Sequence, residues 1–184
     1  MVLEYLQQII NNVDVLILQF LYSNFNYPTI NFIMESLTCF GNIIVWIIFC
    51  IIIYLTGDEK AKTTAKLCFL AVIFTFYLTE LLKDIINRPR PDDTLHIAPL
   101  TDHINTSMPS GHSAVSFTVF TILTYKYGYW FIFLTIASLI AISRVILGVH
   151  YPSDLIVGAI VGVLSAFLFL YLEKRFLNKD IPDN

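Results

Sequence analysis

Long apolar runs separated by short polar segments dominate most of the chain. They predict five membrane-crossing helices, at about residues 43–56, 61–83, 111–125, 129–147 and 152–172. A helix rises about 1.5 Å per residue, so about 20 residues cross a bilayer core of about 30 Å; the first run reaches this length with the turns before it. Pro152 suits the first turn of the last helix, where no amide hydrogen is needed. We therefore expect an all-α, integral-membrane helical bundle.

The N-terminal region, residues 1–41, has a different pattern. Apolar residues recur at steps of three and four and form one helical stripe: Leu3, Leu6, Ile10, Val13, Ile17 and Phe20. Polar residues occupy the other faces, so we interpret the segment as an amphipathic helix at the membrane interface, although it lacks the usual Lys and Arg. A sixth membrane span is the alternative. Tyr27-Pro28 ends the stripe, and a short amphipathic turn or a tilted entry into the first span follows.

Composition supports a membrane protein and argues against other classes. Of 184 residues, 57% are hydrophobic and 14% are charged, against about 25% charged in typical soluble domains. A net charge of −3 without a basic run argues against nucleic acid as a partner. Cys39, Cys50 and Cys68 lie in apolar runs without metal spacing, and we expect them to be buried. We expect one domain over residues 1–184, because two domains would each be too small.

Basic residues suggest how the bundle is oriented. Seven fall on one side of the five-span arrangement, which is cytoplasmic by the positive-inside rule: Lys60, Lys62, Lys66, Lys126, Lys174, Arg175 and Lys179. The remaining four are on the other side, where this rule does not place them: Lys83, Arg88, Arg90 and Arg144. Positive charge on the extracytoplasmic side therefore calls for another explanation.

The same topology brings distant polar residues to that side. The residues that can converge there are Lys83, Arg90, Ser110, His112, Arg144, His150 and Asp154. A central Arg or Asp costs roughly 2.5–3.5 kcal/mol on membrane-insertion scales, so polar groups kept between apolar helices indicate a functional site.

Three cations and one helix start in this group suit an anionic ligand. The guanidinium of Arg offers a planar fork for phosphate, and Lys adds a further charge. Ser110 can cap the helix that follows, while Gly111 lets a ligand approach the exposed amides of the first turn. Singly, each feature has a structural explanation, such as a snorkelling cation or an ordinary helix start. Jointly they predict a site for a ligand with several anionic oxygens.

Two histidines add chemistry to this site. His150 and Asp154 are four residues apart, so the carboxylate can accept the proton of one ring nitrogen and leave the other free to attack. His112 can protonate a leaving oxygen, which typically contributes about 10²–10⁴-fold in rate. Two His and one Asp beside three cations are poor electrostatics for a divalent ion, so we expect no metal or other cofactor.

These residues resemble the three-part signature of the type 2 phosphatidic acid phosphatase superfamily of lipid phosphatases and vanadium haloperoxidases. The first part is Lys83, six residues, then Arg90-Pro91; the second is Pro109-Ser110-Gly111-His112. The third is Ser143-Arg144, followed by His150 and Asp154. The match covers roughly residues 60–172.

The resemblance implies a role for each residue of the signature. His150 would be the nucleophile that forms a phosphohistidine, Asp154 would orient it, and His112 would protonate the leaving group and then activate water. The phosphoryl oxygens would be held by Lys83, Arg90, Ser110, Gly111 and Arg144. The family works without a metal. Three residues lie outside these roles: Arg88 is interpreted as a surface contact or an alternative phosphate ligand, and His96 and His103 receive no catalytic role.

The expected function is therefore a membrane phosphohydrolase acting on a lipid phosphate or diphosphate, on the extracytoplasmic face of the plasma membrane. A short chain with a small external loop is similar to the polyprenyl (undecaprenyl-type) diphosphate phosphatases. Phosphatidate and phosphatidylglycerophosphate phosphatases share the signature and stay as alternatives, as does a phosphotransferase. A transporter or binder of lipid phosphates is the non-enzymatic alternative. Residues 91–108 are interpreted as a solvated loop or as a lid over the site.

Overall fold

The computed structural model describes residues 1–95, 97–101 and 105–176, and over these residues the regular structure is entirely helical. In chain order the helices are α1 (Val2–Phe25), α2 (Pro28–Cys39), α3 (Ile43–Thr56), α4 (Glu59–Ile86), α5 (Pro91–Leu95), α6 (Gly111–Tyr127), α7 (Trp130–Ile146) and α8 (Pro152–Phe176). Each of the five predicted spans corresponds to one helix, with ends shifted by a few residues. The all-α prediction is confirmed.

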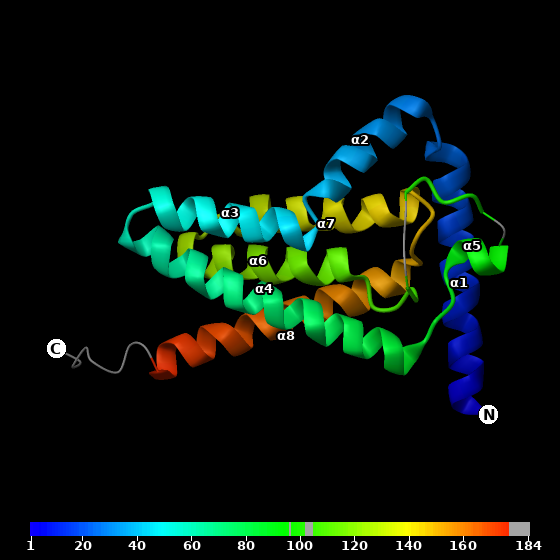
Figure 1. Cartoon of the computed structure of the whole chain (residues 1–184). Helices are drawn as coiled ribbons and strands as arrows, with labels where there is room; N and C mark the ends of the chain where they lie inside the picture. Colours follow the sequence, from blue (N-terminus) through cyan, green and yellow to red (C-terminus); the bar gives the residue numbers. More distant parts are fainter. Residues whose placement is uncertain (96, 102–104, 177–184) are drawn as a thin grey trace.

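Five of these helices form an elongated bundle around α6 (Figure 1). Helix α6 packs against α4, α7 and α8, and α3 packs along α4. The buried core contains residues from each of the five, including Trp46, Val72, Ile122, Ile140 and Ala166. Large apolar side chains such as Leu70, Ile156 and Leu164 are exposed on the outside of the bundle, which suits helices surrounded by lipid rather than by water.

By length and composition, two stretches of the described residues could cross a membrane: residues 59–95, which include α4, and α8. Helices α2 and α3 together pass the same test but are bent by 55° at their junction, so they count as a third only if they form one broken span. Helix α7 is apolar but shorter. The predicted count of five spans thus stays a prediction.

The helix ends follow from local sequence. The side chain of Asp58 accepts a hydrogen bond from Ala61 N at 2.8 Å and begins α4. Asn87 adopts the left-handed conformation (φ 48°) that commonly ends a helix. Asn42 and Ser110 cap α3 and α6 in the same way as Asp58. As a result, α4 ends at the same end of the bundle at which α6 and α8 begin (Figure 1).

Helix α1 lies across this end of the bundle rather than along it (Figure 1) and contacts α7 and α8. The predicted apolar stripe, from Leu6 to Phe20, is exposed, whereas Asp14 and Leu18 are buried against the bundle. Helix α1 is not among the candidate spans. The crosswise orientation agrees with the predicted interfacial helix, but the inward-facing residue that makes the polar contacts is a carboxylate.

One minor prediction about the cysteines is wrong. Cys50 and Cys68 are buried as expected, but Cys39 is exposed at the end of α2, where its Sγ hydrogen-bonds to the carbonyl of Glu35. The last turn of α2 meets the bundle through the neighbouring Thr38, which is buried, and the side chain of Cys39 lies on the other side of that turn.

Helices α6 and α8 approach closely because Gly162 of α8 has no side chain where it meets the backbone of Ala114 in α6. A Cβ at Gly162 would lie 2.2 Å from the carbonyl oxygen of Ala114, so Gly162→Ala must push the helices apart. We expect it to lower the stability by about 1–3 kcal/mol, as overpacking typically does. Thermal unfolding in detergent measures this. Ile160→Ala, at an exposed position of the same helix, is the control, and equal stability of the two variants would contradict the close packing.

Candidate active site

A cavity of about 360 Å³ lies at the end of the bundle where α4 ends and α6 begins. It collects residues that are far apart in sequence, and six of the predicted site residues line it: Lys83, Arg90, Gly111, His112, Arg144 and His150. The other two, Ser110 and Asp154, are fully buried and contact the lining residues. The α2–α3 junction contributes the remaining edge through Gly41 and Asn42.

His150 lies between α7 and α8, in a turn that Gly148 permits through its positive φ of 75°. Its Nδ1 is 3.3 Å from Oδ2 of Asp154, and its Nε2 is 3.4 Å from Nη1 of Arg90. Burial lowers the pKa of His150 to about 3, and the Arg144 guanidinium acts in the same direction, while the bond to Asp154 opposes both. The ring is therefore neutral at physiological pH. A proton on Nδ1, donated to Asp154, leaves Nε2 with a free electron pair beside a guanidinium.

Asp154 is completely buried, yet both of its carboxylate oxygens accept hydrogen bonds. Oδ2 accepts from Tyr151 N at 2.8 Å and from the hydroxyl of Ser107, besides facing His150. Oδ1 accepts from Nη1 of Arg88 at 2.7 Å. The carboxylate thus has a fixed orientation, and the oxygen it turns to His150 is also held by two other donors.

The three cations of the cavity differ in how they are held. Arg90 donates to the carbonyls of Asn105 and Val149, which fix its plane, and burial lowers the pKa of Arg90. Arg144 donates through Nη1 to Thr38 Oγ1 at 2.9 Å. Its buried Nε has no hydrogen-bond partner among the described residues. That unused donor in a cationic cavity fits an anionic ligand atom.

Lys83 has a partner that sequence reasoning missed. Its Nζ donates to Glu80 Oε1 at 2.7 Å and to Asn105 Oδ1 at 3.3 Å. Asn105 in turn donates to the other oxygen of Glu80. The spacing of three residues between Glu80 and Lys83 on one helix is a signal that could have identified the pair.

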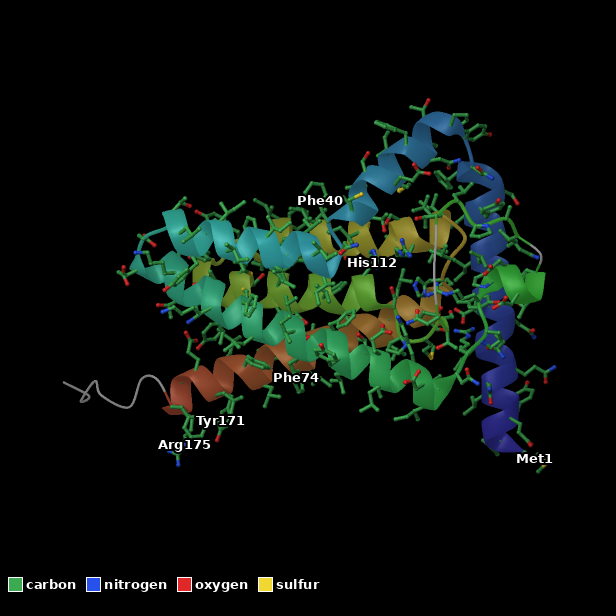
Figure 2. The ribbon with its side chains drawn as sticks, in the orientation of Figure 1. Met1, Phe40, Phe74, His112, Tyr171 and Arg175 are labelled. Carbon is green, nitrogen blue, oxygen red and sulfur yellow. The ribbon has the colours of Figure 1, made fainter. Side chains whose placement is uncertain are left out.

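The start of α6 brings its first turn to the cavity. Ser110 caps the helix through Ser113 N, and the backbone N–H of Ser110 donates to the carbonyl of Asp154 at 3.0 Å. Figure 2 places His112 beside the corner between α2 and α3, near Phe40. There a Cβ at Gly41 would lie 2.7 Å from the His112 ring, so only glycine lets this corner pack so closely on the histidine.

The structure corrects the interpretation of Arg88. It is neither a surface contact nor a phosphate ligand, because its guanidinium is mostly buried and forms ion pairs with Asp14 and Asp154. The described part of residues 91–108 is not a simple solvated loop, since it contains α5 and the hydrogen bonds of Asn105 and Ser107. His96 and His103 lie outside the described residues.

The geometry of this cavity agrees with the family and the relatives that the sequence matches. A model of the PAP2 superfamily matches residues 64–177. The chain belongs to the PAP2 superfamily. The undecaprenyl-diphosphatase of Sulfolobus acidocaldarius is 30% identical over 82% of this chain and 75% of its own length. The bacitracin transport permease protein BcrC of Bacillus licheniformis is 30% identical over 84% of this chain and 74% of its own.

The fold also matches a solved member of the superfamily. The crystal structure of a transmembrane PAP2-type phosphatidylglycerolphosphate phosphatase from Bacillus subtilis superposes with a TM-score of 0.72 at 28% identity, covering 90% of this chain and 87% of that one. The apolar helices and this membrane relative identify the PAP2 protein described here as an integral membrane protein. Two of these three relatives are phosphatases of lipids by name, the undecaprenyl-diphosphatase and the phosphatidylglycerolphosphate phosphatase.

The depressed pKa of His150 predicts a pH dependence of stability. In the unfolded chain an ordinary histidine, with a pKa of 6.5, binds a proton below that pH, whereas the folded His150, with a pKa of about 3, does not. Stability is therefore full above pH 6.5 and is lost as pH falls from 6.5 toward 3, by about 2 kcal/mol at pH 5. Thermal unfolding at pH 7.5 and 5 should show a smaller loss in His150→Gln, whose side chain does not titrate. An equal loss in both proteins would contradict the neutral, buried imidazole.

Proposed function

We propose that this PAP2 protein is a membrane phosphohydrolase that removes phosphate from a lipid phosphate or diphosphate through a phosphohistidine on His150. The observation that carries the proposal is the neutral imidazole of His150, with Nδ1 at Asp154 and Nε2 at Arg90 in a cavity of three cations. A nucleophile needs a free electron pair, and the cations would stabilise the charge that develops on the phosphoryl oxygens.

In the first step, Nε2 of His150 attacks phosphorus, and the bond from phosphorus to the lipid oxygen breaks. The Nδ1 proton stays hydrogen-bonded to Asp154, which stabilises the positive charge on the ring. His112 lines the same cavity; the negative charge of a bound phosphate would favour its protonated form, which would give a proton to the leaving oxygen. The products are a phosphohistidine and the lipid with one phosphate fewer, which is a lipid alcohol from a monophosphate and a lipid monophosphate from a diphosphate.

In the second step, water attacks the phosphohistidine and the N–P bond breaks. The now neutral His112 takes a proton from that water, which restores both histidines and releases phosphate. Lys83, Arg90 and Arg144 would hold the phosphoryl oxygens in both steps, together with the amides at the start of α6. No metal is part of this proposal, because these three side chains supply the positive charge at the phosphoryl group.

The apolar outer surface of the helices beside the cavity supports a substrate whose phosphate is attached to a lipid. Exposed apolar side chains cover the helices beside it, so a hydrocarbon tail could lie in the bilayer while the phosphate enters the cavity. We favour a polyprenyl diphosphate of the undecaprenyl type, since one relative carries that activity in its name. Phosphatidate and phosphatidylglycerophosphate are the other candidate substrates; the latter appears in the name of the structural relative.

The charge distribution supports a site on the extracytoplasmic face of the plasma membrane. Lys60 lies over the ring of Tyr127, which shows that the start of α4 and the end of α6 meet. Lys174 and Arg175 end α8 at the end of the bundle opposite the cavity (Figure 2). These basic residues would face the cytoplasm by the positive-inside rule, and the cavity would face away from it.

A phosphate-release assay in detergent tests this function. Polyprenyl diphosphate, phosphatidate and phosphatidylglycerophosphate are compared in the presence of EDTA. We expect release from at least one of them, and radiolabelled phosphate on His150 when the reaction is stopped rapidly. His150→Ala should lower kcat by about 10³-fold or more, and His112→Ala by about 10²–10⁴-fold.

His96→Ala is the matched control, because this histidine lies outside the signature. Full activity of His150→Ala would overturn the nucleophile assignment. Liposome flux of the lipid without phosphate release would instead favour a transporter, and transfer of the label to another acceptor would favour a phosphotransferase.

A further inference from the structure

The guanidinium of Arg88 joins two buried carboxylates that lie on different helices. Its Nη1 donates to Asp154 Oδ1 at 2.7 Å, and its Nη2 donates to Asp14 Oδ2 at 2.7 Å. Its plane lies over the ring of Tyr151, with Cζ 4.1 Å from the ring centroid. Both terminal nitrogens of the guanidinium, Nη1 and Nη2, and one of its faces have partners, so Arg88 has little freedom to turn.

Asp14 is the far end of this arrangement and comes from α1. It is 2% exposed and, besides Arg88, accepts hydrogen bonds from the backbone N–H and the hydroxyl of Ser153 at 2.9 and 2.5 Å. Ser153 immediately precedes Asp154 in the first turn of α8. Helix α1 therefore holds the start of α8 twice, once directly and once through Arg88, although it lies outside residues 64–177 that match the superfamily.

This contact decides which oxygen Asp154 presents to His150. With Arg88 on Oδ1, the donors Tyr151 N, Ser107 and His150 Nδ1 share Oδ2. Without the guanidinium, Oδ1 would be a buried charged atom without a partner, and the carboxylate would turn or shift to find one. The 3.3 Å contact to His150 Nδ1 is the longest hydrogen bond of this carboxylate among the described residues, so it would be lost first.

From this geometry we infer that Asp14 and Arg88 form a positioning pair for Asp154. They hold the carboxylate in the orientation that keeps the proton of His150 on Nδ1 and its Nε2 free. Neither residue lines the cavity in which the phosphoryl group would lie. The inference rests on the proposed function of His150 and adds a requirement for α1, which the signature does not include.

The first test compares variants that change the pair in different ways. Arg88→Met should lower kcat by about 10–100-fold, as the loss of a residue that orients a side chain of the active site typically does. KM should change by less than about twofold. Arg88→Lys keeps the positive charge but cannot donate to both carboxylates as the guanidinium does. Its kcat should lie between that of Arg88→Met and that of the wild type. Asp14→Asn keeps an acceptor for Ser153 N and should lower kcat by roughly 3–10-fold.

Lys126→Met is the matched control. It breaks a buried ion pair between two helices, α6 and α8, with Glu173 at the opposite end of the bundle. It should lower thermal stability like Arg88→Met but leave kcat within about twofold, because a change in stability alone does not alter the chemistry of the folded fraction. Equal kcat in Arg88→Met and Lys126→Met would overturn the inference.

The second test needs no substrate. In ¹⁵N-histidine-labelled protein, the ring nitrogens of His150, assigned from their absence in His150→Gln, report which one carries the proton. We expect the proton on Nδ1 in the wild type and in Lys126→Met, and a shift toward Nε2 in Arg88→Met. An unchanged tautomer in Arg88→Met would overturn the positioning role, whereas failure of the wild type to release phosphate would overturn only the proposed function.

Discussion

The buried carboxylate of Asp154 is the interaction on which the candidate site depends. A charge without access to water must be paired and hydrogen-bonded, or it costs several kcal/mol. Here its four partners come from three separate segments: the guanidinium of Arg88, the hydroxyl of Ser107, and the ring of His150 with the backbone of the adjacent Tyr151. Satisfying one buried charge therefore brings the end of α4, the loop before α6 and the start of α8 together.

The close packing of α6 on α8 serves the same site. A Cβ at Gly158 would lie 2.5 Å from the carbonyl oxygen of Ser110, so glycine allows the capped start of α6 to meet the first turn of α8. The backbone hydrogen bond from Ser110 to Asp154 follows from this approach. Small residues commonly let helices in membranes come this close, and in this bundle they also set the distance between the helix-start amides and the histidine.

The N-terminal helices complete the site from outside the stretch that defines the superfamily. Asp14 of α1 holds Arg88, Thr38 of α2 holds Arg144, and Gly41 packs on the ring of His112. These contacts hold Arg144 and His112 of the signature directly, and Asp154 of the signature through Arg88.

The sequence alone was sufficient for the helices of the bundle and for six of the residues that line the cavity. Apolar periodicity and helix-capping residues are local properties, and alternating helix direction places Lys83, His112 and His150 at one end of the bundle. The spacing of the signature residues added the chemistry. The tertiary structure was needed to show the crosswise orientation of α1, the contacts of Asn105 with Lys83 and Glu80, and the burial of Arg88 between two carboxylates. These depend on side chains from distant segments meeting at angles that no local pattern encodes, because a buried charge can be satisfied by any carboxylate the fold brings within reach.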